Sequence, residues 1–236
     1  MKKIFMLKYI ISFFILINVV SVFSQKEKDT ITTSTYGMKI GIDLSKQIRM
    51  LTESDYKGLV VVGDYRLLDK LFLAFEIGTE EKLIENEVLN FNTKGSFLKV
   101  GANYNVFNNF KDLENEIYVG FRMGSSKFEH QLNSFTIYNK DQYWSQNEIN
   151  STELFKSLTG TWFELIFGFN AEVFRNTYMG LSLRLKRLLS QKEPNNFRNL
   201  YIPGFNKVLE NNKVGVGLTY TIQFQIPIYK KKKKSN

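Results

Sequence analysis

The sequence predicts an all-β fold: an eight-stranded, antiparallel, up-and-down transmembrane β-barrel preceded by a cleavable signal peptide. The stretch V-G-V-G-L-T-Y-T-I-Q-F-Q-I-P-I-Y at residues 214–229 alternates large apolar side chains with small or polar ones. This period of two is longer than most soluble strands need, and it suits a tilted strand that crosses a bilayer. The pattern recurs along the chain, behind an N-terminus that has the layout of a secretory leader.

The alternating segments predict eight strands joined by alternately short and long connections. The links between strands 2 and 3, 4 and 5, and 6 and 7 are short, and the other four are long. Outer-membrane barrels show this asymmetry, with short periplasmic turns and longer external loops, and an even strand number puts both termini in the periplasm. The expected strands are Tyr36–Lys46, Lys57–Leu67, Leu71–Glu80, Lys94–Phe107, Asn115–Ser126, Gly160–Phe174, Thr177–Leu189 and Lys213–Tyr229.

The expected organisation is a signal peptide at residues 1–25, a barrel at 36–229 and a lysine-rich periplasmic tail at 230–236. Lys2 and Lys3 precede an apolar core at Ile10–Val20, and small residues then offer cleavage near Ser24 or Gln25. An uncleaved anchor is the alternative. No later stretch approaches 18 continuous apolar residues, so we expect no transmembrane helix in the mature chain.

Charge and cysteine content argue against nucleic-acid binding and exclude cysteine chemistry. The net charge is +9, but eight lysines lie at the two ends, which leaves about +1 for the rest of the chain. The sequence therefore offers no basic groove of the kind that binds nucleic acid. Cysteine is absent, which excludes disulfides, a thiolate metal site, a catalytic cysteine and a lipid-attachment cysteine.

The side-chain volumes indicate which face of each strand points outward. One face is almost entirely Leu, Ile, Val, Phe and Met, and the other is rich in glycine and charge. An eight-stranded interior is only just wide enough for side chains to fill, so we expect the glycine-rich face inside and the bulky face against lipid. A soluble lipocalin-like barrel, with its apolar face lining a pocket, is the alternative.

The inward face carries nearly balanced charges, which predicts an ionic core that plugs the lumen, because isolated buried charges each cost several kcal/mol. A charge-lined pore is the alternative. The expected core consists of Lys39, Asp43, Asp64, Arg66, Glu76, Lys99, Glu116, Arg122, Glu164, Glu172, Arg184 and Lys186.

Four segments resemble a family of unknown function from Bacteroidota whose members are predicted outer-membrane barrels. They are Y-G-M-K-I-G-I-D-L-S-K (Tyr36–Lys46), D-Y-K-G-L-V-V-V-G-D-Y-R-L (Asp55–Leu67), N-T-K-G-S-F-L-K-V-G (Asn92–Gly101) and K-E-P-N-N-F-R-N-L-Y-I-P-G-F-N (Lys192–Asn206). The resemblance implies a barrel at the outer membrane and carries no catalytic residues.

Catalytic and metal signals are weak. His130 is the single histidine, and we expect it to be a solvated residue of a long loop, although a triad with Ser and Asp is an alternative. Glu81, Glu85 and Glu87 could offer oxygen ligands to Ca²⁺, but their spacing matches no known loop. We therefore expect no catalytic residue, no cofactor and no metal.

Two expected external loops, Phe128–Trp144 and Asn196–Val208, are rich in aromatic residues. We expect these side chains to pack the loops together over the barrel mouth or to form the external aromatic belt. A contact surface for a partner, glycan or lipopolysaccharide is the alternative. The lysine tail either is solvated or touches anionic head groups. The candidate contact residues are Phe128, Tyr138, Tyr143, Trp144, Phe197, Tyr201 and Phe205.

These observations favour a non-enzymatic barrel with a structural or cell-surface interaction role. We expect a monomer with both termini in the periplasm, outer-membrane lipid and an unspecified surface ligand or cell-wall contact as partners, and no nucleic acid. The alternatives are a small passive channel, a lipid-processing barrel enzyme and a soluble periplasmic lipocalin-like binder.

Overall fold

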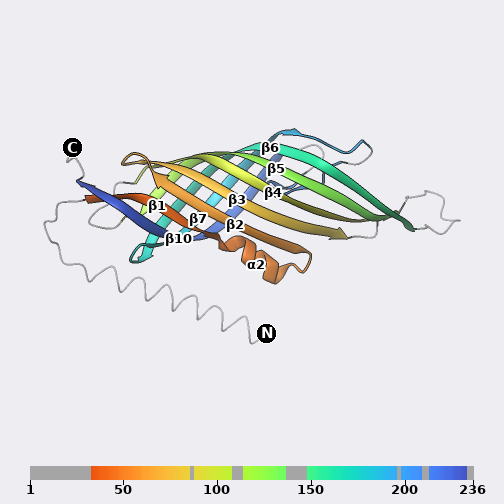
Figure 1. Cartoon of the computed structure of the whole chain (residues 1–236), viewed down its shortest axis with the longest axis horizontal. Helices are drawn as coiled ribbons and strands as arrows, with labels where there is room; N and C mark the ends of the chain where they lie inside the picture. Colours follow the sequence, from red (N-terminus) through yellow and green to blue (C-terminus); the bar gives the residue numbers. More distant parts are fainter. Residues whose placement is uncertain are drawn as a thin grey trace, which may run out of the picture. The chain divides into compact units, whose positions relative to one another are not determined.

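The computed structural model describes residues 33–85, 88–107, 114–136, 148–195, 198–208 and 213–232. Eight antiparallel strands close into a barrel in the order β1-β10-β7-β6-β5-β4-β3-β2 (Figure 1). They are β1 (Thr33–Asp43), β2 (Tyr56–Arg66), β3 (Leu71–Glu85), β4 (Leu89–Asn105), β5 (Glu116–Thr136), β6 (Glu148–Phe174), β7 (Thr177–Gln191) and β10 (Val214–Lys232). The predicted all-β architecture of eight antiparallel strands is confirmed.

The two ends of the barrel differ. We call the end with the β2–β3 and β6–β7 turns the base, and the opposite end the mouth. Helix α2 (Leu44–Thr52) follows β1 at the mouth, and the small hairpin of β8 (Tyr201–Ile202) and β9 (Asn206–Lys207) lies in the connection between β7 and β10. In the described part of the chain, no helix has the length and apolar character of a membrane span.

Strands β3 to β6 extend further than the sequence predicted (Figure 1). Residues 81–85 pair with residues 90–94, and residues 127–136 of β5 pair with β4 and with the start of β6. Much of the two predicted long loops is therefore strand, because the alternation of inward and outward side chains continues past the expected strand ends. The tips at residues 86–87 and 137–147 lie outside the described residues.

The bulky aliphatic face of the strands points outward. Phe167 and Leu183 are 48% and 45% exposed, whereas Glu164 and Arg184, their neighbours on the same strands, are 0% and 5% exposed. We call this outward surface the apolar belt. It comprises Ile40, Leu73, Ile77, Leu98, Val100, Ile117, Val119, Phe121, Met123, Leu165, Phe167, Phe169, Leu183, Leu185, Val216, Leu218, Phe224 and Ile226.

Both ends of the chain's barrel segment pair with each other. Thr33 to Thr35 lie opposite Lys232 to Lys230, so the first three lysines of the predicted tail belong to β10. The predicted signal peptide and the remaining tail residues lie outside the described residues.

Candidate functional site in the barrel lumen

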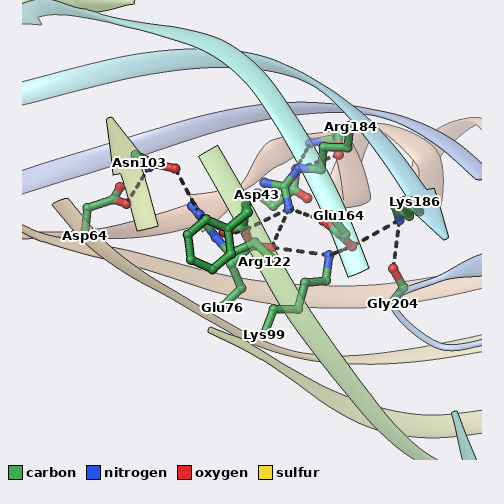
Figure 2. Close-up of polar contacts among 12 residues, drawn as sticks. Asp43, Asp64, Glu76, Lys99, Asn103, Arg122, Glu164, Arg184, Lys186 and Gly204 are labelled. Carbon is green, nitrogen blue, oxygen red and sulfur yellow. Dashed lines mark hydrogen bonds and ion pairs between the residues drawn. The ribbon is translucent and has the colours of Figure 1, made fainter. Parts of the chain in front are cut away.

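Two buried glutamates organise the centre of the lumen (Figure 2). Arg184 Nη1 donates to both carboxylate oxygens of Glu76, at 2.7 Å each. Glu164 lies 3.0 Å from Lys99 Nζ and 3.3 Å from Arg184 Nη1, and Lys99 also reaches Glu76 at 3.4 Å. Because these side chains come from strands that face each other across the lumen, the ion pairs connect opposite walls of the barrel.

A second group of polar side chains continues the network towards the base. Arg122 Nη1 donates to Asn103 Oδ1 at 2.9 Å, and Asn103 Nδ2 donates to Asp64 Oδ1 at 3.2 Å (Figure 2). Gln223 Nε2 donates to the other oxygen of Asp64 at 2.7 Å. The carboxylate of Asp64 is thus held by amide groups, while the Arg122 side chain also approaches Glu76 at 3.5 Å.

Two further ion pairs fill the barrel near its base. Lys39 Nζ donates to Glu116 Oε1 at 2.5 Å, and its ammonium also lies 4.1 Å from the centre of the Tyr178 ring. Arg66 pairs with Glu114 at 3.2 Å. Glu114 is a member of this ionic core that the sequence prediction missed, because it precedes the first residue of β5, where alternation gives no signal.

Eleven of the twelve expected core residues are buried in the lumen. Two of the twelve, Asp43 and Glu172, do not belong to the ion network, and for these two the prediction is wrong. Asp43 caps the N-terminus of α2, where it accepts hydrogen bonds from the Ser45 backbone N–H at 3.0 Å and from its hydroxyl at 2.5 Å. Glu172 is only partly buried and accepts from the Asn176 backbone N–H at 2.9 Å in the β6–β7 turn. Both carboxylates therefore satisfy backbone or local donors at strand ends and do not enter the ion network.

An apolar cluster lies above the ions, towards the mouth. Trp162 is fully buried, and its indole Nε1 donates to Glu164 Oε1 at 2.7 Å, so it joins the two layers. Gly124 makes room for this ring, because a Cβ there would lie 2.7 Å from the indole nitrogen. The cluster contains Val60, Val62, Phe97, Phe128, Leu158, Trp162, Leu188, Ile202 and Phe205. The apolar run Gly58–Val62 was a sequence signal for it.

The connection between β7 and β10 enters this cluster, and we call its residues 199–205 the plug. Glu80 Oε2 accepts from the Tyr201 hydroxyl at 2.7 Å and from the Gly204 backbone N–H at 3.0 Å. Lys186 Nζ donates to the Gly204 carbonyl at 2.8 Å. Gly204 has a φ of +83°, and a Cβ there would lie 2.6 Å from the Phe97 ring, so glycine is required on both counts.

The predicted contact residues divide into two groups. Phe128, Tyr201 and Phe205 are 3%, 2% and 1% exposed, so they cannot form an external contact surface. They pack in the mouth, because the plug and the extended β5 strand turn their aromatic rings inward. Tyr138, Tyr143, Trp144 and Phe197 lie outside the described residues.

The prediction that His130 is a solvated loop residue is wrong. His130 lies on β5, above the apolar belt, and is fully buried between Phe91 and Phe128. Its Nε2 lies 3.0 Å from Asn199 Oδ1, and its Nδ1 lies 2.7 Å from the Thr93 hydroxyl. Because Asn199 uses its amide nitrogen to donate to the Lys192 carbonyl, its oxygen accepts from the imidazole, and the Thr93 hydroxyl donates to Nδ1. The histidine thus ties the plug to the wall.

Burial determines the charge state of this histidine. It lowers the pKa of His130 to about 4, and the hydrogen bond to Asn199 opposes the shift only in part. Glu53, on the outside of the mouth, is instead held in its charged form. Its pKa is lowered to about 2, because Arg49 and Lys82 donate hydrogen bonds to its carboxylate. His130 is therefore neutral at pH 7, and Glu53 is charged.

Little free space lies between the ion-network side chains of the described residues. A cavity of about 20 Å³ lies among Asp64, Glu76, Tyr118, Arg122 and Gln223, which is room for about one water molecule. The described residues thus form a closed eight-stranded β-barrel whose interior is filled by an ion network and an apolar plug.

The family of the chain is known from its sequence. Residues 6–231 match the model of a domain of unknown function, DUF6048, and the chain belongs to that family. No curated protein matches the chain. Among solved structures, the chain is similar to Ail, the attachment invasion locus protein of Yersinia pestis, with 8% identity over 83% of this chain and 99% of that chain and a TM-score of 0.38. Because this similarity is low, the barrel architecture rests on the chain's own strand pairing.

Proposed function

We propose that this protein is a small outer-membrane barrel with a plugged lumen, which serves a non-enzymatic structural or interaction role at the cell surface. The observation that carries the proposal is the division of side chains between the two faces of the barrel wall. Exposed aliphatic side chains surround the barrel, while most of its charged strand residues at the same height point inward and pair with each other. Water-exposed sheets have the opposite arrangement, and lipid-exposed barrels have this one.

The upper limit of the apolar belt supports the same placement. On β5 the outward residues are aliphatic or aromatic from Ile117 to Met123, and they become polar at Ser125 and Lys127. On β4 the change falls between Leu98 and Ser96. Ser96 lies directly opposite Lys127, so the boundary continues from strand to strand, as the edge of a hydrocarbon layer requires.

The extended strands above this boundary give the proposal its cell-surface part. The hairpins β3–β4 and β5–β6 project beyond the apolar belt, and their outward residues are mostly Lys, Glu, Asn and Gln, with a few aliphatic residues such as Leu83 and Leu154 among them. With the termini in the periplasm, these hairpins face the outside of the cell. A rigid sheet that projects from a membrane is well suited to present a contact surface.

Fractionation tests the location, and gel mobility tests the fold. We expect the full chain in the detergent-extracted outer-membrane fraction, with a mobility that shifts on boiling. Recovery without detergent would refute the location and favour a soluble binder.

Conductance tests the plugged lumen. The refolded barrel should be silent in planar bilayers at 1 M KCl, because the ion network and the plug of the described residues fill the lumen between them. Regular single-channel steps in the unmodified protein would refute the plugged lumen and favour a passive channel.

A further inference from the structure

The outer surface of the barrel changes its chemistry in three steps above the apolar belt, on strands β2 to β6. The first row across the sheet is rich in hydroxyl groups and holds one lysine: Thr79, Ser96, Lys127 and Thr159 lie opposite one another. The second row is Lys57, Glu81, Lys94 and Glu129. The third row contains Asn92 and Gln131, flanked by Leu83 and Leu154.

A depression lies over the first two rows. Its volume is about 710 Å³, and four lysines from four different strands line it: Lys57, Lys94, Lys127 and Lys156. All four side chains are exposed. Leu59 and Met50 line it as well, so apolar and cationic groups share one concave surface. Three glutamates also line it, Glu80, Glu81 and Glu129. The Glu80 side chain is buried and pairs with Lys46, and the four lysines still leave a net positive charge.

A second depression of about 320 Å³ continues away from the belt and shares Lys57 and Glu81 with the first. Its lining is mostly polar: it includes the amides of Asn92, Gln131 and Asn133, together with Asp55 and one apolar residue, Leu83. Asn92 donates to Glu81 Oε1 at 2.9 Å, and Gln131 beside it is exposed. Carboxamide groups are suited to bind sugar hydroxyls, because each offers both a donor and an acceptor.

We propose that these two depressions bind a phosphorylated glycolipid of the outer leaflet. The acyl chains lie along the apolar belt below Leu59, a phosphate group lies among Lys127, Lys156 and Lys94, and the sugars that follow lie against the amide row. The order of chemistry along the sheet matches such a lipid from tail to head. This inference rests on the proposed function, since the depressions face the outer leaflet only in a barrel that spans the outer membrane.

The competing explanation is a ladder of cross-strand charge pairs that stabilises the sheet. It accounts for Lys57 and Lys94, which lie opposite Glu81. It does not account for Lys127, which lies opposite Ser96 and Thr159, or for Lys156, which lies in the irregular part of the β5–β6 pairing. These two lysines are therefore the informative ones.

The test measures binding of bisphosphorylated lipid A to the purified full-length barrel in a nonionic detergent, by native mass spectrometry at fixed ionic strength. We expect wild type to bind the lipid, and the double variant Lys127→Gln/Lys156→Gln to bind it roughly 10-fold to 30-fold more weakly, given the usual contribution of a lysine at an anionic surface. Lys127→Arg should bind as wild type does, because it keeps the charge.

The matched control is Arg187→Gln/Lys213→Gln, which removes two exposed cations from the opposite side of the barrel. It should bind within 2-fold of wild type. Equal losses in both double variants would overturn the proposal, because they would indicate general attraction of charge. Unchanged binding in the Lys127→Gln/Lys156→Gln variant would also overturn it.

Two further probes separate the ligand classes. Lipid A without its phosphates should bind at least 10-fold more weakly, and phosphatidylglycerol should not displace the glycolipid; the reverse of either result would overturn the proposal. Heat-modifiable mobility confirms that each variant is folded. Failure of the chain to fractionate with the membrane would refute the proposed function separately, whatever the lipid binding.

Discussion

Loss of the Glu164 carboxylate is the perturbation for which the structure gives the clearest magnitude. Glu164 is fully buried and lies 3.0 Å from Lys99, 3.3 Å from Arg184 and 3.8 Å from Lys186. In Glu164→Gln, Lys99 and Arg184 keep Glu76 as a partner, at 3.4 and 2.7 Å. Lys186 keeps only carbonyl oxygens of the plug. A buried cation without a carboxylate should lower the free energy of unfolding by about 3–5 kcal/mol.

A second substitution separates charge from packing. Lys186→Met removes the cation that Glu164→Gln leaves unpaired, while a chain of similar length remains. The double variant should therefore lose less than the sum of the two single variants, with a coupling of about 2 kcal/mol or more. The hydrogen bonds from Lys186 to the plug are lost in both backgrounds and do not contribute to this difference.

Urea unfolding of the barrel in lipid vesicles measures these free energies, and fluorescence of the buried Trp162, which contacts Glu164, reports the transition. Glu153→Gln is the matched control, because it makes the same chemical change at an exposed position of β6, and it should shift the free energy by less than about 0.5 kcal/mol. Unchanged stability of Glu164→Gln, or strictly additive losses in the double variant, would refute the interpretation of the ion network.

Three other predictions concern the mouth. His130 has a pKa of about 4 in the folded protein, below the usual 6.5. The stability that the neutral imidazole contributes is therefore complete above about pH 6.5 and is lost as the pH falls towards 4. Between pH 7.5 and 4, the free energy of unfolding measured in urea should fall by up to about 3 kcal/mol more in wild type than in His130→Gln. Equal losses would contradict this. Gly124→Ala should cost about 1–3 kcal/mol and shift the emission of Trp162, whereas Gly215→Ala, whose Cβ would be in ordinary van der Waals contact with Phe205 at 3.5 Å and Lys186 at 3.7 Å, should not. Tyr201→Phe removes the hydroxyl that donates to Glu80, so it should cost about 1–3 kcal/mol and raise hydrogen exchange in the plug, with exchange in β5 unchanged as the internal reference.

The sequence predicts the barrel well because each strand lies between two different surroundings, a packed polar lumen inside and an apolar belt outside, and its residues alternate accordingly. Ile117 to Met123 alternate with Glu116, Tyr118, Gly120 and Arg122, and the structure keeps that register throughout. The polarity of the two faces then reverses on the same strand. At Lys127, Phe128, Glu129 and His130 the outward residues are charged and the inward ones are apolar or aromatic.

That reversal explains the wrong interpretation of the mouth. A window of charged and aromatic residues resembles a loop when apolar side chains are expected on the outward face alone, so the predicted loop includes Phe128 and His130. The period of two continues in this part of the sequence, but here the apolar residues lie on the inward face and the charged residues on the outward face. The ion pairs themselves could not be predicted in detail, because partners such as Glu76 and Arg184 come from strands that are distant in sequence and meet only across the closed lumen. Asp43 was assigned to the core because strand alternation carries no information on helix capping.

The place of the plug in the chain bears on how the molecule is assembled. Residues 199–205 lie in the connection that leads to β10, the last strand, which pairs with both β7 and β1 and so closes the ring. A sheet of the other seven strands alone would be open between β7 and β1, and Glu164 and Arg184 on its inner side would be accessible to water. The segment that covers these charges is thus joined in sequence to the strand that closes the ring, so we expect burial of the charges and closure of the barrel to be coupled.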